Sequence, residues 1–154
     1  MYDLIHQNLH RQFKGLELLL SLLQEEFEFL CQRDTDSVSG LEFSIHELLR
    51  QIAVERMELK NTMQQTKLLD YAAMLPDEES QEVRRLFHLI DGLEQHCSRQ
   101  ATHNTELSLA LLDQSHELMV FLHKHIAPKP TQCYGSQGRL CDSRPGAAIY
   151  SGRF

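Results

Sequence analysis

The 154-residue chain is predicted to be an all-α antiparallel bundle of three long helices with a flexible C-terminal tail. Apolar residues recur at alternating intervals of three and four over most of the chain, which is the period of helices packed lengthwise on one another. The character changes at Ala127–Pro128, because residues 128–154 contain three of the four prolines and four of the seven glycines. We therefore expect a helical bundle over 1–127 and a flexible, partner-binding tail over 128–154.

The first helix is predicted at about 3–33. Its seam positions alternate intervals of four and three without a fault: Leu9, Phe13, Leu16, Leu20, Leu23, Phe27 and Leu30. Leu19, Leu22 and Phe29 widen this stripe beyond a two-stranded seam. A broad apolar face indicates that the helix touches more than one neighbour.

The second helix is predicted at about 40–74. Ser39 and Glu42 have the spacing of a capping box, and Phe43 stands where it would close a hydrophobic staple. The apolar seam consists of Leu41, Ile45, Leu48, Ile52 and Leu59. Because the run 60–67 is polar, we expect this part of the helix to project beyond the core or to fray.

The third helix is predicted at about 78–126. Pro76 precedes it, and acidic residues occupy its first turn, where the helix dipole favours them. Its apolar seam consists of Leu86, Ile90, Leu93, Leu107, Leu111, Leu118 and Phe121. Since it is longer than the first helix, it must either overhang the bundle or bend near 98–105, which would give four helices.

The middle of this seam is polar, with Gln100, Asn104 and Gln114 at apolar positions. One interpretation is that these residues fix the register of the bundle at some cost in stability. The other is that the body does not cover this part of the helix. We favour the second interpretation for 98–105, because polar and small residues cluster there.

Composition excludes several classes of function. The net charge is −7, and because the tail over 128–154 carries +3, residues 1–127 carry −10. A body this acidic repels phosphate backbones, so we expect no nucleic-acid partner. No run reaches 18 apolar residues and the N-terminus lacks a signal-peptide pattern. We therefore expect a cytoplasmic protein with no membrane insertion and with free thiols at its four cysteines.

The sequence offers no convincing set of catalytic or metal-binding residues, so we expect neither an enzyme nor a cofactor. His6 and His10 lie one helical turn apart, and His116 and His123 lie two turns apart, but neither pair has a third ligand at a fixed spacing. Phosphate loops and nucleophile elbows do not occur. We interpret the histidines as surface residues, and a metal-binding bundle is the less favoured alternative.

One segment of the tail departs from plain linker composition. Tyr134 is an aromatic residue of the kind enriched in binding hot spots, and Gly135 and Gly138 let the backbone turn and dock. On physical grounds alone, a disordered terminus and a short linear binding motif fit these residues equally well.

Three segments carry a resemblance to a known family. They are the leucine-rich segment 16–26, the second heptad helix with Leu48, Leu49 and Arg56, and the tail segment Tyr134-Gly135-Ser136-Gln137-Gly138-Arg139. With them, nearly the whole chain resembles the FlgN-type flagellar export chaperones of bacteria. Many coiled coils share the helical features, so the Tyr-Gly-x-x-Gly-Arg pattern after a long terminal helix is the more specific one.

The resemblance implies a small cytosolic chaperone that binds the hook–filament junction proteins, of the FlgK and FlgL types, without ATP. It implies delivery of these clients to the export gate of the flagellar type III apparatus, with Tyr134 docking to that gate. The implied partner-binding residues are Tyr134, Gly135, Gly138, Arg139 and Leu140 in the tail, and Leu107, Leu111, Leu118 and Leu122 in the third helix. The alternative is a structural or signalling coiled-coil module without chaperone activity, and homodimerisation stays open.

Overall fold

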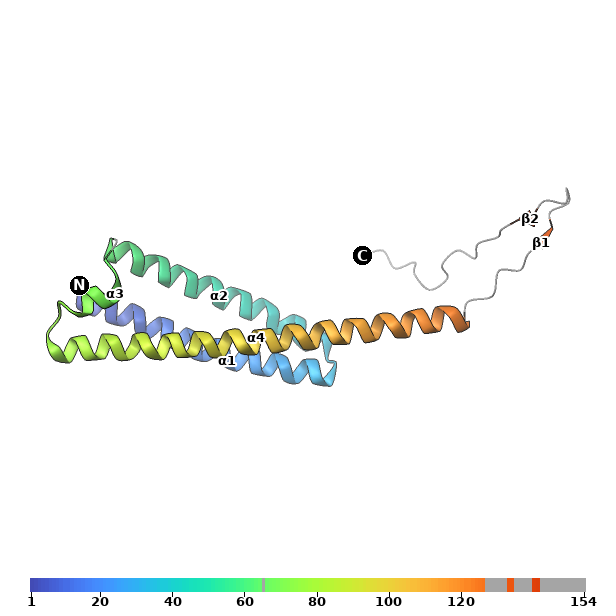
Figure 1. The fold of residues 1–154 in the computed structure, drawn as a ribbon, viewed down its shortest axis with the longest axis horizontal. Helices are drawn as coiled ribbons and strands as arrows, with labels where there is room; N and C mark the ends of the chain where they lie inside the picture. The colour runs from blue at the N-terminus through green and yellow to red at the C-terminus, as the bar shows by residue number, and fades with distance from the viewer. Residues whose placement is uncertain (65, 127–132, 135–139, 142–154) are drawn as a thin grey trace. The chain divides into compact units, whose positions relative to one another are not determined.

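The structure is a computed structural model that describes residues 1–64, 66–126, 133–134 and 140–141 (Figure 1). Its elements are α1 (Tyr2–Gln32), α2 (Thr35–Met63), α3 (Leu68–Ala72), α4 (Asp77–Ile126), β1 (Cys133–Tyr134) and β2 (Leu140–Cys141). The predicted all-α class with three long helices is confirmed, and α3 is an additional short helix. Most of the predicted flexible tail lies outside the described residues. No described helix has the length and apolar character needed to cross a bilayer.

The chain divides into two compact units, Met1–Ser108 and Leu109–Phe154, and α4 contributes residues to both. In the first unit, α1 and α2 form an antiparallel pair, and the N-terminal part of α4 lies along α1 (Figure 1). The buried apolar residues of this unit are Ile5, Leu9, Leu16, Leu19, Leu23, Ile45, Ile52, Met63, Ala72, Val83, Leu86, Ile90 and Cys97.

A tight turn at Arg33 and Asp34 reverses the chain between α1 and α2. Arg33 adopts the left-handed conformation (φ 59°), and its N–H donates to the Leu30 carbonyl, which closes α1. Asp34 caps α2, because its carboxylate accepts hydrogen bonds from the Ser37 N–H (3.2 Å) and the Ser37 hydroxyl (2.6 Å). The chain therefore returns along α1 after only two connecting residues.

The prediction that the second helix begins after a capping box at Ser39 is wrong. Asp34, which precedes Ser39 in the chain, accepts a hydrogen bond from an N–H group in the first turn and so begins the helix there. Ser39 lies inside α2, and its hydroxyl donates to the Thr35 carbonyl (2.9 Å). Phe43, which was expected to close a hydrophobic staple, is instead 77% exposed. The local pattern is present in the sequence, but a stronger cap precedes it.

Helix α2 also ends earlier than predicted, at Met63 rather than near residue 74. Gln64 adopts the left-handed conformation (φ 56°) and ends the helix inside the polar run 60–67. The chain then forms α3 as a separate helix, which places Ala72 fully inside the core. Helix α4 follows Pro76, whose carbonyl accepts the Ser80 N–H at 2.9 Å.

Helices α1 and α2 approach closely at Gly15. A Cβ atom at this position would lie 3.1 Å from the Ile52 Cγ1 atom, a distance that real Cβ contacts seldom reach. The absence of a side chain at Gly15 therefore lets α2 pack closely against α1. Helix α4 runs parallel to α1 at a constant offset of 81 residues, as shown by the pairs Cys97 with Leu16 and Asn104 with Leu23.

A polar cluster links α1 and α2 within this core. The Asn8 amide donates to the main-chain carbonyl of Glu55 (2.9 Å) and to its carboxylate (2.6 Å). Gln12 donates to the Asn8 side-chain oxygen at 2.6 Å, and Arg11 binds both carboxylate oxygens of Glu55 at 2.7 and 2.8 Å. Because buried polar groups are costly without partners, this cluster favours a single register of the two helices.

The prediction that the body leaves 98–105 uncovered is wrong on the inner side of α4, and the register interpretation holds there. Asn104 is 4% exposed, and its amide donates to the Leu23 carbonyl (2.8 Å) and to the Glu26 carboxylate (2.6 Å). Its own oxygen accepts a hydrogen bond from Gln100 at 3.0 Å. The helix continues unbroken through this segment.

Candidate functional site

The C-terminal part of α4, residues 109–126, carries apolar side chains that the described structure does not bury. No side chain between Leu109 and Ile126 is buried. The exposed apolar residues are Leu109, Leu112, Leu118, Met119, Val120, Phe121 and Ile126. Contiguous exposed apolar surface of this kind marks a site of protein interaction.

Most of these side chains share one side of the helix, because successive residues are rotated by ~100°. We call this side the α4 apolar face; it consists of Leu111, Leu112, Leu118, Met119, Phe121, Leu122 and Ile126. Asp113 and Glu117 lie on the opposite side. This part of α4 is therefore an amphipathic helix.

A local contact at the end of α4 involves one member of this face, Phe121, which is still 55% exposed. The rings of Phe121 and His125 stack with their centroids 4.1 Å apart, and His125 Nδ1 lies 2.8 Å from the Phe121 carbonyl oxygen. The Ser115 hydroxyl donates to the Leu111 carbonyl at 2.8 Å. Basic residues occupy the last turn, where the helix dipole favours positive charge.

The structure places the predicted α4 residues on or beside the α4 apolar face. Leu118 is 57% exposed, whereas Leu111 and Leu122 are half-buried. Leu107 is half-buried on the same side of the helix and belongs to the first unit. Their role in binding a partner stays a prediction.

The described part of the tail consists of the backbone of β1 and β2. Tyr134 in β1 is the antiparallel register partner of Leu140 in β2. Two of the predicted partner-binding residues therefore lie opposite one another. The other three, Gly135, Gly138 and Arg139, fall outside the described residues.

Sequence reasoning missed three members of the α4 apolar face, Leu112, Met119 and Ile126. It followed one seam with alternating intervals of three and four, whereas the exposed face spans about half of the helix circumference. On a helical wheel these three residues follow one another at seven-residue intervals and form a second row beside Leu111 and Leu122. The missed signal was therefore the width of the stripe.

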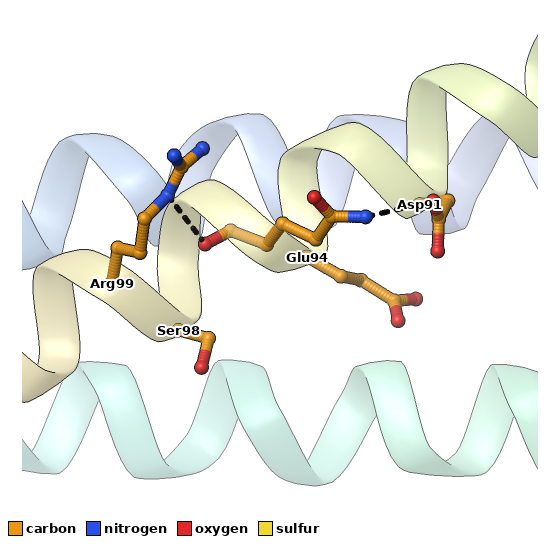
Figure 2. Close-up of a pocket in the computed structure, with 5 residues that line it drawn as sticks. Asp91, Glu94, Ser98 and Arg99 are labelled. Carbon is orange, nitrogen blue, oxygen red and sulfur yellow. Dashed lines mark hydrogen bonds between the residues drawn. The ribbon is translucent and has the colours of Figure 1, made fainter.

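An open hollow of about 510 Å³ borders α4 in the first unit (Figure 2). Its lining residues are Asp91, Glu94, Gln95, Ser98 and Arg99. Gln95 donates to the Asp91 carboxylate (3.0 Å), and the Arg99 Nε donates to the Gln95 carbonyl (3.3 Å). Glu94 forms an ion pair with Arg56 of α2. Of the charged side chains that line this hollow, Glu94 therefore has its partner on α2, whereas Asp91 and Arg99 bond to Gln95 within α4.

Four aromatic rings form a ladder along α1, with successive centroids 5.6, 6.4 and 6.4 Å apart. They belong to Tyr2, His6, His10 and Phe13. The pKa of Glu82 in α4 is lowered, chiefly by a hydrogen bond from Arg85 and also by the charges of His6 and His10.

Among the described residues, no group of three or more histidine, cysteine or acidic side chains is placed to hold a metal ion.

Comparison with known proteins identifies one family. A family model described as "FlgN protein" matches residues 1–140 of the chain. A search of curated proteins and a search of solved structures each gave no match. The matched range includes all four helices, so it covers the α4 apolar face as well as the bundle.

Proposed function

Because this chain belongs to the FlgN family of flagellar export chaperones, we propose that its clients are hook–filament junction proteins of the FlgK and FlgL types. It binds them in the cytoplasm and delivers them to the export gate of the flagellar type III apparatus. The observation that supports client binding is the α4 apolar face, where Leu118 and Phe121 stand exposed on an amphipathic helix.

The geometry of this face suits a helical client segment. An amphipathic helix of the client lays its own apolar side against Leu118 and its neighbours, as in other helix-in-groove complexes. Binding hides apolar client surface that would otherwise aggregate. Since a disordered segment loses entropy when it folds on binding, the affinity stays moderate and the client is released without a covalent step.

A few side chains should dominate the affinity. Full burial of a leucine or phenylalanine side chain contributes about 1.5–3 kcal/mol. Loss of one such contact therefore weakens binding by about 10- to 100-fold. Leu118 is the most informative position because it is exposed and lies between Leu111 and Leu122 on the face.

The test is isothermal titration of purified FlgK- and FlgL-type proteins into the full-length chain. Leu118→Asp should weaken binding by about 10- to 100-fold. Leu18→Asp is the matched control, because Leu18 is 52% exposed, close to the 57% of Leu118, and lies on α1. Unchanged binding by Leu118→Asp would show that the client does not bind at the α4 apolar face. Wild-type protein that binds neither client would favour the coiled-coil alternative.

Delivery to the export gate is proposed to require Tyr134. The pairing of Tyr134 with Leu140 in the short β1–β2 hairpin supports this role, because it brings two candidate docking residues together. We expect Tyr134→Ala to keep client affinity but to reduce secretion of the junction proteins from cells. The control is Tyr150→Ala, a change of the same type in the same tail, and cells that carry it should secrete the junction proteins normally. Normal secretion by Tyr134→Ala would contradict the role.

A further inference from the structure

Two cysteines of the tail occupy directly opposed positions in the hairpin. Strands β1 and β2 pair antiparallel (Figure 1), and Cys133 of β1 is the register partner of Cys141 of β2. The adjacent register pair is Tyr134 with Leu140. The cysteine pair is therefore next to the two candidate docking residues, on the side away from the segment that joins the strands.

This register alone places the two cysteines within disulfide distance. Directly opposed residues of an antiparallel pair have their Cα atoms about 4.5–5.5 Å apart, whichever of the two kinds of ladder position they occupy. A disulfide joins residues whose Cα atoms are about 4.4–6.8 Å apart. A bond between Cys133 and Cys141 therefore needs no change in the pairing of the strands.

We propose that Cys133 and Cys141 form a reversible disulfide that closes the β1–β2 hairpin, with oxidised glutathione or a similar disulfide as the oxidant. One cysteine thiolate attacks the oxidant, forms a mixed disulfide and releases the first glutathione. The second cysteine thiolate attacks the protein sulfur of that mixed disulfide and releases the second glutathione. The two protein sulfurs lose two electrons, glutathione gains them, and the two thiol protons leave with the two glutathiones.

The other two cysteines differ from this pair in their surroundings. Cys97 is buried in the first unit, and burial raises the pKa of its thiol. Since the thiolate is the reacting species, Cys97 exchanges slowly. Cys31 is exposed and also belongs to the first unit, whereas Cys133 and Cys141 both belong to the second. Cys31 is therefore the thiol that a test must remove by substitution.

Closure should stabilise a hairpin that is weak without it. Each strand has two residues, and an isolated two-stranded hairpin is marginally stable in water. A disulfide lowers the loop-closure entropy of the open chain, so the ratio of hairpin to open chain should rise by about 10- to 100-fold. In a reducing compartment the pair is a dithiol, and a transient disulfide there serves as a redox sensor.

The bond should act as a switch on docking to the export gate. Closure holds Tyr134 opposite Leu140, so the closed chain presents both residues together for more of the time. This consequence rests on the proposed docking role of Tyr134, whereas the disulfide itself does not. The two claims are therefore tested by separate measurements.

The disulfide is tested by oxidising the full-length Cys31→Ser chain over a series of ratios of reduced to oxidised glutathione. After acid quenching and alkylation, trypsin cleaves after Arg139, so fragments with Cys133 and Cys141 stay joined only by a disulfide. Mass spectrometry then gives the equilibrium constant for closure. The matched control is Leu140→Cys/Cys141→Leu in the same background, which keeps the composition and moves the second cysteine by one register position.

The native register should close with an equilibrium constant at least about tenfold larger than that of the control, because cysteines on opposite faces of a strand pair are not bridged without backbone movement. The control has the shorter loop, so an unstructured chain would close it at least as easily. Equal constants would overturn the proposal. Mixed disulfides with glutathione that never proceed to closure would overturn it as well.

The effect on docking is measured by titrating the closed and dithiol forms of the Cys31→Ser chain into purified export-gate protein. The closed form should bind about tenfold more tightly, because a larger fraction of it is in the docking conformation. Adding Cys133→Ser/Cys141→Ser should remove the effect of oxidation. Equal affinities of the two forms would show that the bond is not a switch. A chain that binds the gate in neither form would contradict the role of Tyr134 and leave the measured disulfide intact.

Discussion

Asn104 of α4 donates its side-chain amide to the main-chain carbonyl of Leu23 in α1, at 2.8 Å. This buried hydrogen bond stands in a seam that is otherwise largely apolar. The neighbouring pair, Cys97 Sγ with the Leu16 carbonyl, has the same offset of 81 residues. The two contacts fix how far α4 is shifted along α1, and thereby which part of α4 enters the first unit.

The Asn104 hydrogen bonds should be required for stability. Asn104→Ala removes the donor to Leu23 and leaves Gln100 without its side-chain acceptor. We expect the free energy of unfolding to fall by about 1–3 kcal/mol in urea titrations. Asn61→Ala, at an exposed asparagine of α2, should change it little. Equal effects of the two variants would show that the register bond is not important.

The close approach of α1 and α2 should depend on Gly15. A valine there would press its Cβ against Ile52, already 3.1 Å from the ideal position, so Gly15→Val should lower the free energy of unfolding by about 1–3 kcal/mol. Gly92→Ala is the contrasting change, because nothing lies within 4 Å of its Cβ position. It should raise stability by about 0.5–1 kcal/mol through helix propensity. A stable Gly15→Val protein would contradict the packing described.

Glu55 should be the acceptor on which the polar cluster between α1 and α2 depends. Glu55→Ala leaves both Asn8 and Arg11 without its carboxylate, and we expect a loss of about 1–3 kcal/mol in thermal or urea unfolding. Glu58→Ala, one turn away at an exposed position of the same helix, serves as control. If the two variants unfold alike, the cluster contributes no net stability.

The cap at Asp34 should make stability depend on pH. Hydrogen bonds from the Ser37 hydroxyl and N–H lower the pKa of this carboxyl below its usual value. Its contribution is therefore fully present above the unfolded pKa and is lost as the pH falls through the lower folded pKa. Between roughly pH 5 and pH 3, the urea midpoint of the wild type should fall more than that of Asp34→Asn, which keeps a cap that does not titrate. Identical slopes would contradict this.

Much of the fold was predictable because its causes are local and periodic. The seam of α1 repeats without interruption, and its predicted ends lie within one residue of Tyr2 and Gln32. The start of α2 was missed because two capping patterns compete, and Asp34 precedes Ser39 in the chain. Which cap forms depends on the turn at Arg33, and a capping pattern alone does not specify that turn.

The burial of Asn104 was missed for a different reason. Polarity in the seam was interpreted as exposure, because the acceptors that satisfy Asn104 lie in another helix, about 80 residues earlier in the chain. The candidate site was predicted in part, since Leu118 follows the helical period. The width of the face is also present in the sequence as a second row of apolar residues that includes Met119, and the structure adds that this row is exposed.

The central claim is that a client contacts the α4 apolar face, and photo-cross-linking tests it most directly. A benzophenone amino acid replaces Leu118 in one variant and Leu18 in another, so that equally exposed positions on different helices are compared. On irradiation with a purified FlgK- or FlgL-type protein, the probe at 118 should form a cross-linked product and the probe at 18 should not. A cross-link from 18 alone, with none from 118, would contradict the account.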